Sequence, residues 1–353
     1  MTAIRRGLVG VLVDETELSM VDGVRGELVI RGHAVEDLAG RVSFEATVAL
    51  LESGVLPLED LPIRGRLGTH RLRAFERIPS LGGALTCEDG MVALRGSLGS
   101  LPADIDPIAA TAVFVAAWSR IRRGLRPIRP DPAQSHTSDL LRMTLGEADP
   151  AAVRALEAYL VTIVDHGFNA STFAARVVAS TGSDRVSAVV AGIGALKGPL
   201  HGGAPGPVLD MLDAIGDSDP AEWITQELAA GRRIMGMGHR IYRVRDPRAA
   251  VLAKAMVGLP ASSRLALAEA VEAAAERALA ERHRGRELKA NVEFYTAVLL
   301  EAIGLPRWMF SATFACGRVA GWCAHFAEQQ RAGVLIRPKA RYVGPLPVRY
   351  TDA

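Results

Sequence analysis

The stretch Asp106-Pro107-Ile108-Ala109-Ala110 opens a long apolar run, and its first two residues recur together at 149–150, 219–220 and 246–247. An aspartate before a proline is typical of a helix start. Its carboxylate accepts hydrogen bonds from the free N–H groups of the first turn, and proline at the first helical position lacks only an N–H that would be free anyway. Apolar residues then follow at a spacing of three to four, as on one face of a helix. The pattern predicts four helix starts.

Similar spacing predicts further helices at Phe44–Ser53, Pro205–Ile215, 261–284 and 309–330. No series of β-branched strands alternates with these helices, so a parallel sheet is not expected. Alternating apolar and polar residues over 8–30, around Asp22-Gly23 and Gly26, predict one short β-hairpin. The fold class is therefore mostly α, and the glycine- and proline-rich breaks at 202–207 and 304–306 are the best candidate hinges.

Composition limits the classes of function. The chain has 353 residues, of which 49% are hydrophobic, enough for one elaborated domain or two. A net charge of +2 does not favour nucleic acid as a partner. The three cysteines have no CxxC spacing, and a zinc site at Cys316, Cys323 and His325 is rejected because they occupy an apolar helical stretch. Apolar runs are too short to cross a bilayer, so we expect a soluble protein. The cysteine pattern fits the reducing cytoplasm, and no metal site is expected.

The segment GPLHGGA, residues 198–204, holds His201 between a proline and two glycines. Proline restricts the approach of the chain, and glycines allow backbone or ligand to come close. A predicted helix follows at Pro205, and its N-terminal dipole would keep the imidazole neutral, as a hydrogen-bond donor to a carbonyl. A tight turn with an incidental histidine explains the segment equally well on its own.

Two further segments place histidines among glycines and small polar residues. In DHGFNAST, residues 165–172, His166 interrupts an apolar region, where a buried polar group needs a partner or a use. In GMGHRIYR, residues 236–243, His239 follows two glycines and precedes the helix at Asp246-Pro247. The free N–H groups of that helix start and the Arg248 guanidinium suit a carboxylate. Arg240, Arg243 and Arg245 could reach a larger anion, although a solvated basic loop explains them as well.

One carboxylate and two arginines complete the candidate set. Glu293 lies among apolar and aromatic residues in ANVEFY, 290–295, where desolvation would raise its pKa and make it a better base. An ordinary glutamate at a helix start is the alternative. Arg318 lies in an apolar helix and needs an anionic partner, whereas Arg337 by itself resembles a surface residue. Together these groups fit carbon–carbon bond formation between an acyl thioester and a keto-dicarboxylate.

The chain resembles the citrate synthase family from about residue 7 to residue 345. The resemblance rests on seven motifs in the order typical of that family, namely GELVIRG (26–32), DHGFNASTFAARV (165–177), GALKGPLHGGA (194–204), GMGHRIYRVRDPRA (236–249), ANVEFY (290–295), CGRVAGWCAH (316–325) and RPKARYVGP (337–345). It implies a large helical domain, 1–203 with 304–353, and a small one, 204–303, which close over a cleft.

The resemblance also implies roles for individual residues. His201 would stabilise the enol of acetyl-CoA, His239 would polarise the oxaloacetate carbonyl, and Glu293 would be the base. The oxaloacetate-binding residues would be His166, Arg248, Arg318 and, from the partner subunit of a homodimer, Arg337. CoA would lie along Leu200, Gly236, Gly238, Arg243 and Asn291. CoA enters as a thioester substrate, and no separate cofactor is expected.

Glu293 departs from the family, which usually has aspartate at this position, although bacterial second citrate synthases with glutamate resemble this chain most. The added methylene requires the carboxylate to be withdrawn or rotated, since a misplacement of about 1 Å can cost about 100-fold in rate. Two alternatives stay open beside a citrate synthase of the tricarboxylic acid cycle. They are a 2-methylcitrate synthase that uses propionyl-CoA through the same residues, and a non-catalytic paralogue that binds CoA or a dicarboxylate.

Overall fold

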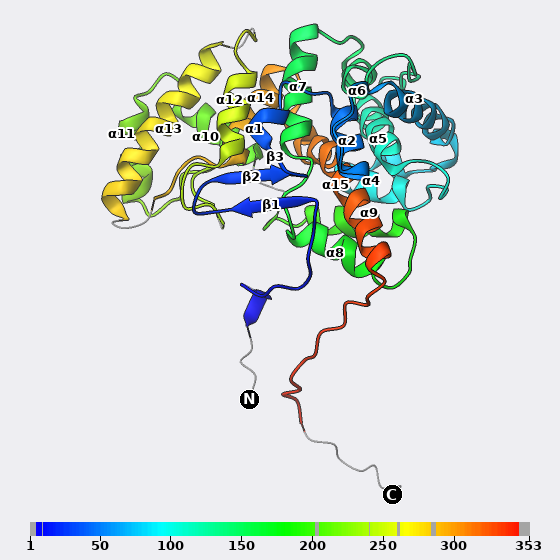
Figure 1. Ribbon diagram of the computed structural model, residues 1–353. Helices are drawn as coiled ribbons and strands as arrows, with labels where there is room; N and C mark the ends of the chain where they lie inside the picture. The colour runs from blue at the N-terminus through cyan, green and yellow to red at the C-terminus, as the bar shows by residue number, and fades with distance from the viewer. Residues whose placement is uncertain are drawn as a thin grey trace, which may run out of the picture.

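Helices form nearly all the regular structure of the chain (Figure 1). The computed structural model describes residues 5–8, 10–201, 205–239, 241–259, 262–283 and 287–345. Helices of the first half are α1 (Val35–Leu38), α2 (Phe44–Ser53), α3 (Leu61–Glu76), α4 (Gly90–Leu98), α5 (Pro107–Arg122), α6 (His136–Leu145), α7 (Pro150–Thr162), α8 (Ala170–Ala179) and α9 (Arg185–Leu196). Those of the second half are α10 (Pro205–Ile215), α11 (Pro220–Ala229), α12 (Pro247–Ala255), α13 (Ser262–Arg282), α14 (Val292–Ala302) and α15 (Phe310–Ala332).

All four predicted Asp-Pro helix starts are confirmed. The side chains of Asp106, Asp149, Asp219 and Asp246 each accept a hydrogen bond of 2.9–3.0 Å from a backbone N–H in the first turn of α5, α7, α11 and α12. The helices predicted at Phe44–Ser53 and Pro205–Ile215 are present with those bounds, and those predicted at 261–284 and 309–330 correspond to α13 and α15. Local capping chemistry therefore determines where the four Asp-Pro helices begin.

The predicted hairpin is present but shorter than expected. Strands β1 (Ser19–Asp22) and β2 (Glu27–Ile30) pair antiparallel, and a third strand, β3 (His33–Ala34), pairs with the other edge of β2. The prediction of a strand from residue 8 is wrong, because residues 6–8 form a 3₁₀ helix and residues 11–18 are irregular. After Ile30 the chain turns through Gly32 into β3, so no strand lies opposite residues 11–18.

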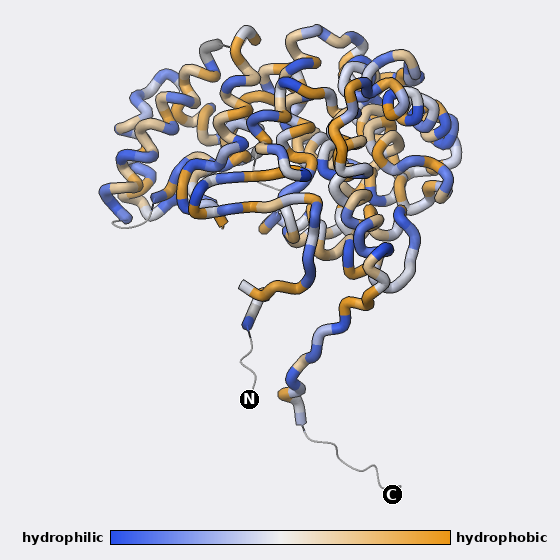
Figure 2. The backbone as a smooth tube through the Cα atoms, in the orientation of Figure 1, coloured by the Kyte–Doolittle hydropathy of each residue, from blue (hydrophilic) through white to orange (hydrophobic). Residues whose placement is uncertain are grey.

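The helices fall into two groups around α7. Helix α5 is buried along most of its length and packs against α3, α4, α6 and α15, while α15 also contacts α8 and α9. On the other side α10 packs on α14, α11 on α13, and α12 on both α14 and α7. Figure 1 shows α10–α14 together on one side of the molecule. Apolar and polar stretches alternate along the tube in Figure 2, as expected for helices with one buried face.

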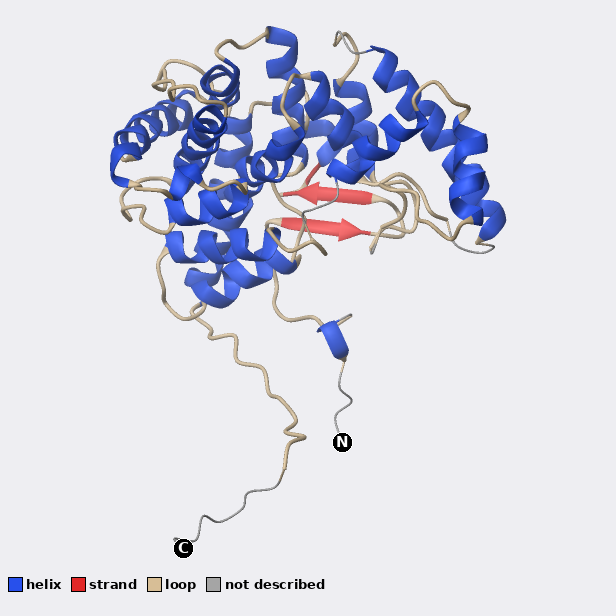
Figure 3. Cartoon of the chain, turned by 180° about the vertical axis from the view of Figure 1, so that it is seen from behind, coloured by secondary structure: helices blue, strands red, loops and turns tan. Residues whose placement is uncertain are grey.

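The hairpin reaches from the middle of the molecule towards α10–α14, as Figures 1 and 3 show from opposite sides. Residues 333–345 follow α15 as an irregular, mostly exposed segment that extends away from the helices. Within the described ranges, no helix has both the length and the apolar character needed to cross a membrane.

Candidate active site

Three aromatic side chains from two distant loops lie together at the centre of the site. His166 follows α7, whereas His239 and Tyr242 precede α12. The ring centroids are 5.7 Å apart for His166 and His239 and 4.8 Å apart for His239 and Tyr242. His166 Nε2 lies 3.1 Å from the Tyr242 hydroxyl. Two of the histidines singled out in the sequence are therefore neighbours in space.

The backbone around His239 fixes the tautomer of its ring. The N–H groups of Ile241 and Tyr242 both donate to His239 Nδ1, each at 3.1 Å. Burial, assisted by the Arg248 charge, lowers the pKa of His239 to about 4. The ring is then neutral at pH 7 with its proton on Nε2, so that this atom is a hydrogen-bond donor.

His201 has the opposite arrangement, because its Nε2 faces the N-terminus of α8. The Ser171 N–H donates to Nε2 at 3.3 Å, and the Ser171 hydroxyl lies 2.9 Å from the same atom. Burial is the main cause that lowers the pKa of His201, followed by the Arg318 charge. With Nε2 accepting, the neutral ring carries its proton on Nδ1.

The environment of the His201 ring differs in one respect from the expectation. The helix whose N–H group reaches the ring is α8, whereas the sequence pointed to the start of α10. Residues 202–204, which include the two glycines after His201, lie outside the described residues, as does Arg240. Asn169 caps α8, since its side-chain oxygen accepts from the N–H groups of Ser171 and Thr172. The DHGFNAST segment thus contains the break between α7 and α8, the capping Asn169 and the first turn of α8.

Glu293 is the second residue of α14, and its N–H donates to Oδ1 of the capping Asn291 at 3.0 Å. Desolvation by the surrounding protein raises the pKa of its carboxyl group to about 7, although the Arg248 charge opposes this. Both sequence expectations hold at once, because the residue occupies a helix start and its pKa is raised. A carboxylate with a pKa near neutrality suits a general base.

The two buried arginines differ in their partners. Nε and Nη2 of Arg248 donate to the two oxygens of Asp246 at 3.0 and 2.7 Å, and the Arg248 N–H also donates to Asp246. The predicted anion site at this helix start thus contains a carboxylate of the chain itself. Arg318 Nε donates to the Ile163 carbonyl at 2.6 Å, and no carboxylate among the described residues forms an ion pair with it. Burial lowers the pKa of Arg318 to about 10.

The glycine loop is bonded to the segment that precedes α14. Gly236 and Gly238 have φ values of 75° and 84°, which favour glycine. Gly238 N–H donates to Lys289 O at 2.7 Å, and Asn291 donates from its N–H to Gly236 O and from Nδ2 to Gly238 O, both at 2.9 Å. These bonds tie the loop with His239 to the start of the helix with Glu293. Leu200 and Arg243, the other predicted CoA contacts, are exposed.

Two of the predicted residues, Arg248 and Arg318, act through their charges on four others. Arg248 perturbs His166, His239 and Glu293, and Arg318 perturbs His166, His201 and Glu293. Arg337 is not among them. It is exposed in the segment after α15, where its Nη1 donates to Pro338 O at 2.6 Å. A single protomer therefore brings together the histidines, Glu293 and two arginines.

Several residues that contact the site were not predicted from the sequence. Tyr242 contacts both His166 and His239, although it lies within a quoted motif. Ser171 contacts His201 and accepts from Trp322 Nε1 at 3.2 Å. Asp165 is buried and 3.2 Å from His325 Nε2. Burial by itself would raise the pKa of Asp165, but His325, Arg318 and the Ser19 hydroxyl together outweigh this and the pKa is lowered.

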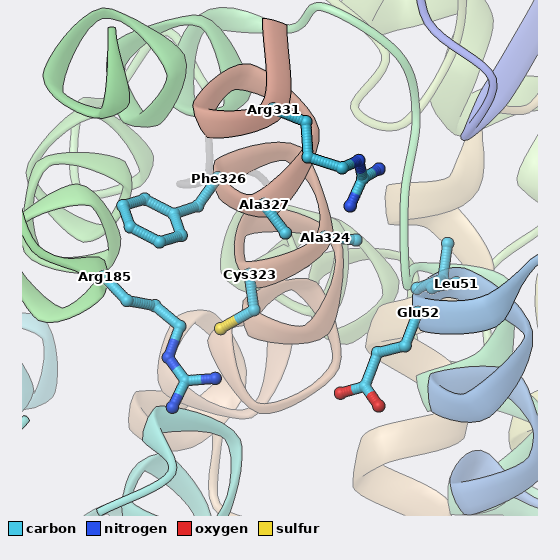
Figure 4. Close-up of a pocket in the computed structure, with 8 residues that line it drawn as sticks. All are labelled: Leu51, Glu52, Arg185, Cys323, Ala324, Phe326, Ala327 and Arg331. Atoms are coloured by element: carbon cyan, nitrogen blue, oxygen red, sulfur yellow. The ribbon is translucent and has the colours of Figure 1, made fainter. Parts of the chain in front are cut away.

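A pocket elsewhere on the surface contains none of these groups. It lies between α2, α9 and the second half of α15, and Glu52, Arg185 and Cys323 are among its lining residues (Figure 4). Among the described residues, no cluster of three or more histidine, cysteine, aspartate or glutamate side chains is arranged to hold a metal ion. Cys316 and Cys323 are buried free thiols.

Comparison with known proteins adds the following findings. The family model "Citrate synthase, C-terminal domain" matches residues 7–339. The chain is 40% identical to the putative citrate synthase 2 of Mycobacterium tuberculosis, over 97% of this chain and 93% of that protein. It is 37% identical to the 2-methylcitrate synthase of the same species, over 97% and 91% of the two chains.

Solved structures are similar over the whole chain. Citrate synthase from Thermotoga maritima aligns with a TM-score of 0.86 at 36% identity, covering 99% of this chain and 98% of that one. A ternary complex of carboxymethyl coenzyme A and oxaloacetate with citrate synthase from Thermoplasma acidophilum aligns with a TM-score of 0.86 at 27% identity, over 100% and 99% of the chains. The mostly α fold class is confirmed.

Proposed function

Because this chain belongs to the citrate synthase family of condensing transferases, we propose that it joins acetyl-CoA to oxaloacetate and hydrolyses the citryl-CoA product to citrate and CoA. One observation carries the proposal. A carboxyl group with a pKa near 7, Glu293, lies in the same charge network as two neutral histidines whose tautomers are fixed by backbone N–H groups. An acid–base pair for enolisation needs such a base beside such donors.

The proposed reaction begins at the acyl methyl group. The Glu293 carboxylate removes a proton from this carbon while Nδ1–H of His201 donates to the thioester oxygen, so that the enol forms. His239 Nε2–H donates to the keto oxygen of oxaloacetate, which makes the carbonyl carbon more electrophilic. The enol carbon attacks it to form the carbon–carbon bond, while the enol oxygen returns its proton to His201 Nδ1 and the keto oxygen takes up the Nε2 proton of His239, which gives the hydroxyl group of citryl-CoA. The proton held by Glu293 passes to solvent, from which His239 regains its own. Water then cleaves the carbon–sulfur bond, which releases citrate and the CoA thiol.

The arginines and His166 are proposed to hold the two carboxylates of oxaloacetate. Arg318 is suited to this role because it is buried and its only described hydrogen bond is to a carbonyl. Charged pairs in a buried site are strong when they are hydrogen-bonded. Arg248 already binds Asp246, so a substrate carboxylate would share its guanidinium with that residue. Oxaloacetate in the Thermoplasma complex is consistent with such a site.

We assign residues 1–203 with 304–353 to a large domain and 204–303 to a small one. His166, His201 and Arg318 then come from the first and His239, Arg248 and Glu293 from the second, so that closure would complete the site and exclude water. CoA is proposed to lie along Leu200, Gly236, Gly238, Arg243 and Asn291, as a substrate, with no resident cofactor or metal.

A homodimer is part of the proposal. Arg337 lies on a segment that extends away from the site of its own protomer, where it could reach a second copy. A cytoplasmic location and a place in the tricarboxylic acid cycle are also part of the proposal.

Use of propionyl-CoA is the nearest alternative, since the chain is nearly as similar to a 2-methylcitrate synthase. One methylene in a pocket is worth only about 1–3 kcal/mol, so one site can accept both thioesters. A non-catalytic paralogue is less well supported. Its only argument is glutamate at position 293, and the raised pKa of that carboxyl group is what a base requires.

Release of free thiol from acetyl-CoA or propionyl-CoA in the presence of oxaloacetate tests these proposals. We expect faster release with acetyl-CoA, and sedimentation of the same sample should show a dimer. A preference for propionyl-CoA would identify the methylcitrate reaction. No release with either thioester from folded protein would support the binding paralogue, and full turnover by a monomer would contradict the shared Arg337.

The pH dependence should follow Glu293. A general base acts only when deprotonated, so kcat/KM for acetyl-CoA should fall about tenfold per unit as the pH drops below a midpoint near 7. Protonation of His239 should add no further loss until the pH approaches 4. A pH–rate profile between 5 and 9 checks this, and a flat profile from 5.5 to 8 would contradict the assignment of the base.

A further inference from the structure

The base of the N-terminal hairpin holds the loop that carries His166. The Ser19 hydroxyl, at the start of β1, donates to the Asp165 carboxylate and accepts from the Gly167 N–H at 2.9 Å. Val21 lies against the same loop, since a Cβ added at Gly167 would be 3.6 Å from its side chain. The residues on both sides of His166 are therefore bonded to, or packed against, one strand.

The tip of the hairpin holds the loop that carries His239. Gly23 O accepts from the Arg243 N–H at 2.7 Å. A Cβ added at Gly23 would lie 2.3 Å from the Ile241 carbonyl oxygen, and one added at Gly26 would lie 2.6 Å from a Val244 methyl carbon. Ile241 also supplies one of the two N–H groups that fix His239. The hairpin thus touches the peptides that orient this ring.

We propose that the hairpin β1–β2 is a strap that sets the position of the His239 loop (235–239 with 241–246) relative to the His166 loop (163–169), with Ser19 and Gly23 as positioning residues. Ser19 and Gly23 lie four residues apart in the chain, yet they bind loops that lie on opposite sides of the proposed domain boundary. The strap therefore controls the distance between the two histidine rings. The condensation requires both rings to be correctly placed.

Side-chain hydrogen bonds to the backbone close the tip. Oδ1 of Asp22 accepts from the N–H groups of Val24 and Arg25, both at 2.9 Å, and these bonds lower the pKa of Asp22. Gly23 is not among the residues with positive φ, so alanine at this position meets no backbone strain of its own. Its methyl group can be accommodated only if the tip and the backbone at Ile241 move apart.

Gly23→Ala tests the proposal. We expect kcat/KM for oxaloacetate to fall about 100-fold, the cost of misplacing a catalytic group by about 1 Å, with unchanged circular dichroism. Val24→Ala, at an exposed neighbouring position, and Gly65→Ala, where a Cβ has open space, should stay within twofold of wild type. Equal activity of Gly23→Ala and Val24→Ala would overturn the strap.

A second readout does not depend on turnover, because the kinetic test rests on the proposed function. Amide hydrogen exchange at 241–243 should be faster in Gly23→Ala than in wild type, while the exchange of α5 is unchanged. Unchanged exchange at 241–243 in Gly23→Ala would contradict the strap even if wild type proves inactive. Faster exchange in Gly23→Ala, together with an inactive wild type, would leave the strap standing while the proposed function fails.

Ser19 provides an independent variant should Gly23→Ala fail to fold. Ser19→Ala removes the hydroxyl between Asp165 and Gly167, and we expect KM for oxaloacetate to rise about tenfold with a smaller change in kcat. Ser19→Thr keeps the hydroxyl and should restore KM. Loss of activity in both variants alike, or in neither, would contradict a positioning role for Ser19.

Discussion

Glu293→Gln is expected to lower kcat by about 1000-fold, because an amide of the same shape cannot accept the proton that the carboxylate removes. The substitution should change only the rate of the chemical step. The side chain keeps its size, and the bond from the residue 293 N–H to Asn291 Oδ1 does not involve the glutamate side chain. Steady-state turnover with acetyl-CoA and oxaloacetate measures it.

Glu222→Gln is a matched control, since Glu222 also lies in the first turn of a helix, α11, but is exposed. It should change turnover by less than twofold. The turnover of Glu293→Asp should lie between those of Glu293→Gln and wild type, because aspartate keeps the carboxylate but holds it one methylene farther from the substrate. More than a tenth of wild-type turnover in Glu293→Gln would show that another group is the base.

His239→Ala is expected to lower kcat by about 100- to 1000-fold, the usual effect of removing a positioned donor to a developing oxyanion. The argument rests on the two backbone N–H groups that leave Nε2 as the protonated atom. Stopped assays of thiol release at saturating oxaloacetate separate this loss from weaker binding.

His283→Ala removes an exposed histidine just after α13 and should leave turnover unchanged. His239→Gln, which keeps an N–H donor, should recover part of the loss. A kcat within threefold of wild type in His239→Ala would mean that a different group polarises the keto oxygen.

The sequence predicted those parts of the fold whose causes are local. Each Asp-Pro pair caps a helix within two or three residues of itself, so that four helix starts could be inferred from adjacent residues. The hairpin turn at Asp22–Gly26 was equally local. The length of its strands has no local cause, because a strand ends where its partner strand ends. Residues 11–18 alternate apolar and polar side chains, but no strand lies opposite them among the described residues.

The site was predicted through its motifs, but not the contacts that orient it. Tyr242 meets His166 across 76 positions of the chain, and Ser19 meets Asp165 across 146. No pattern of spacing reveals such pairs. The pairing of Arg248 with Asp246 is different, since it spans two residues and the capping aspartate had been identified. A capping carboxylate beside an arginine is therefore a local reason to expect that the arginine is already paired.

A structure of the protein with oxaloacetate and carboxymethyl coenzyme A tests the central claim most directly. The account predicts that His239 Nε2 donates to the keto oxygen, that Arg318 and Arg248 hold the carboxylates with Arg337 of the partner subunit, and that Glu293 faces the acyl carbon next to His201. Oxaloacetate bound away from His239 and Arg318, or a Glu293 carboxylate turned away from that carbon, would contradict it.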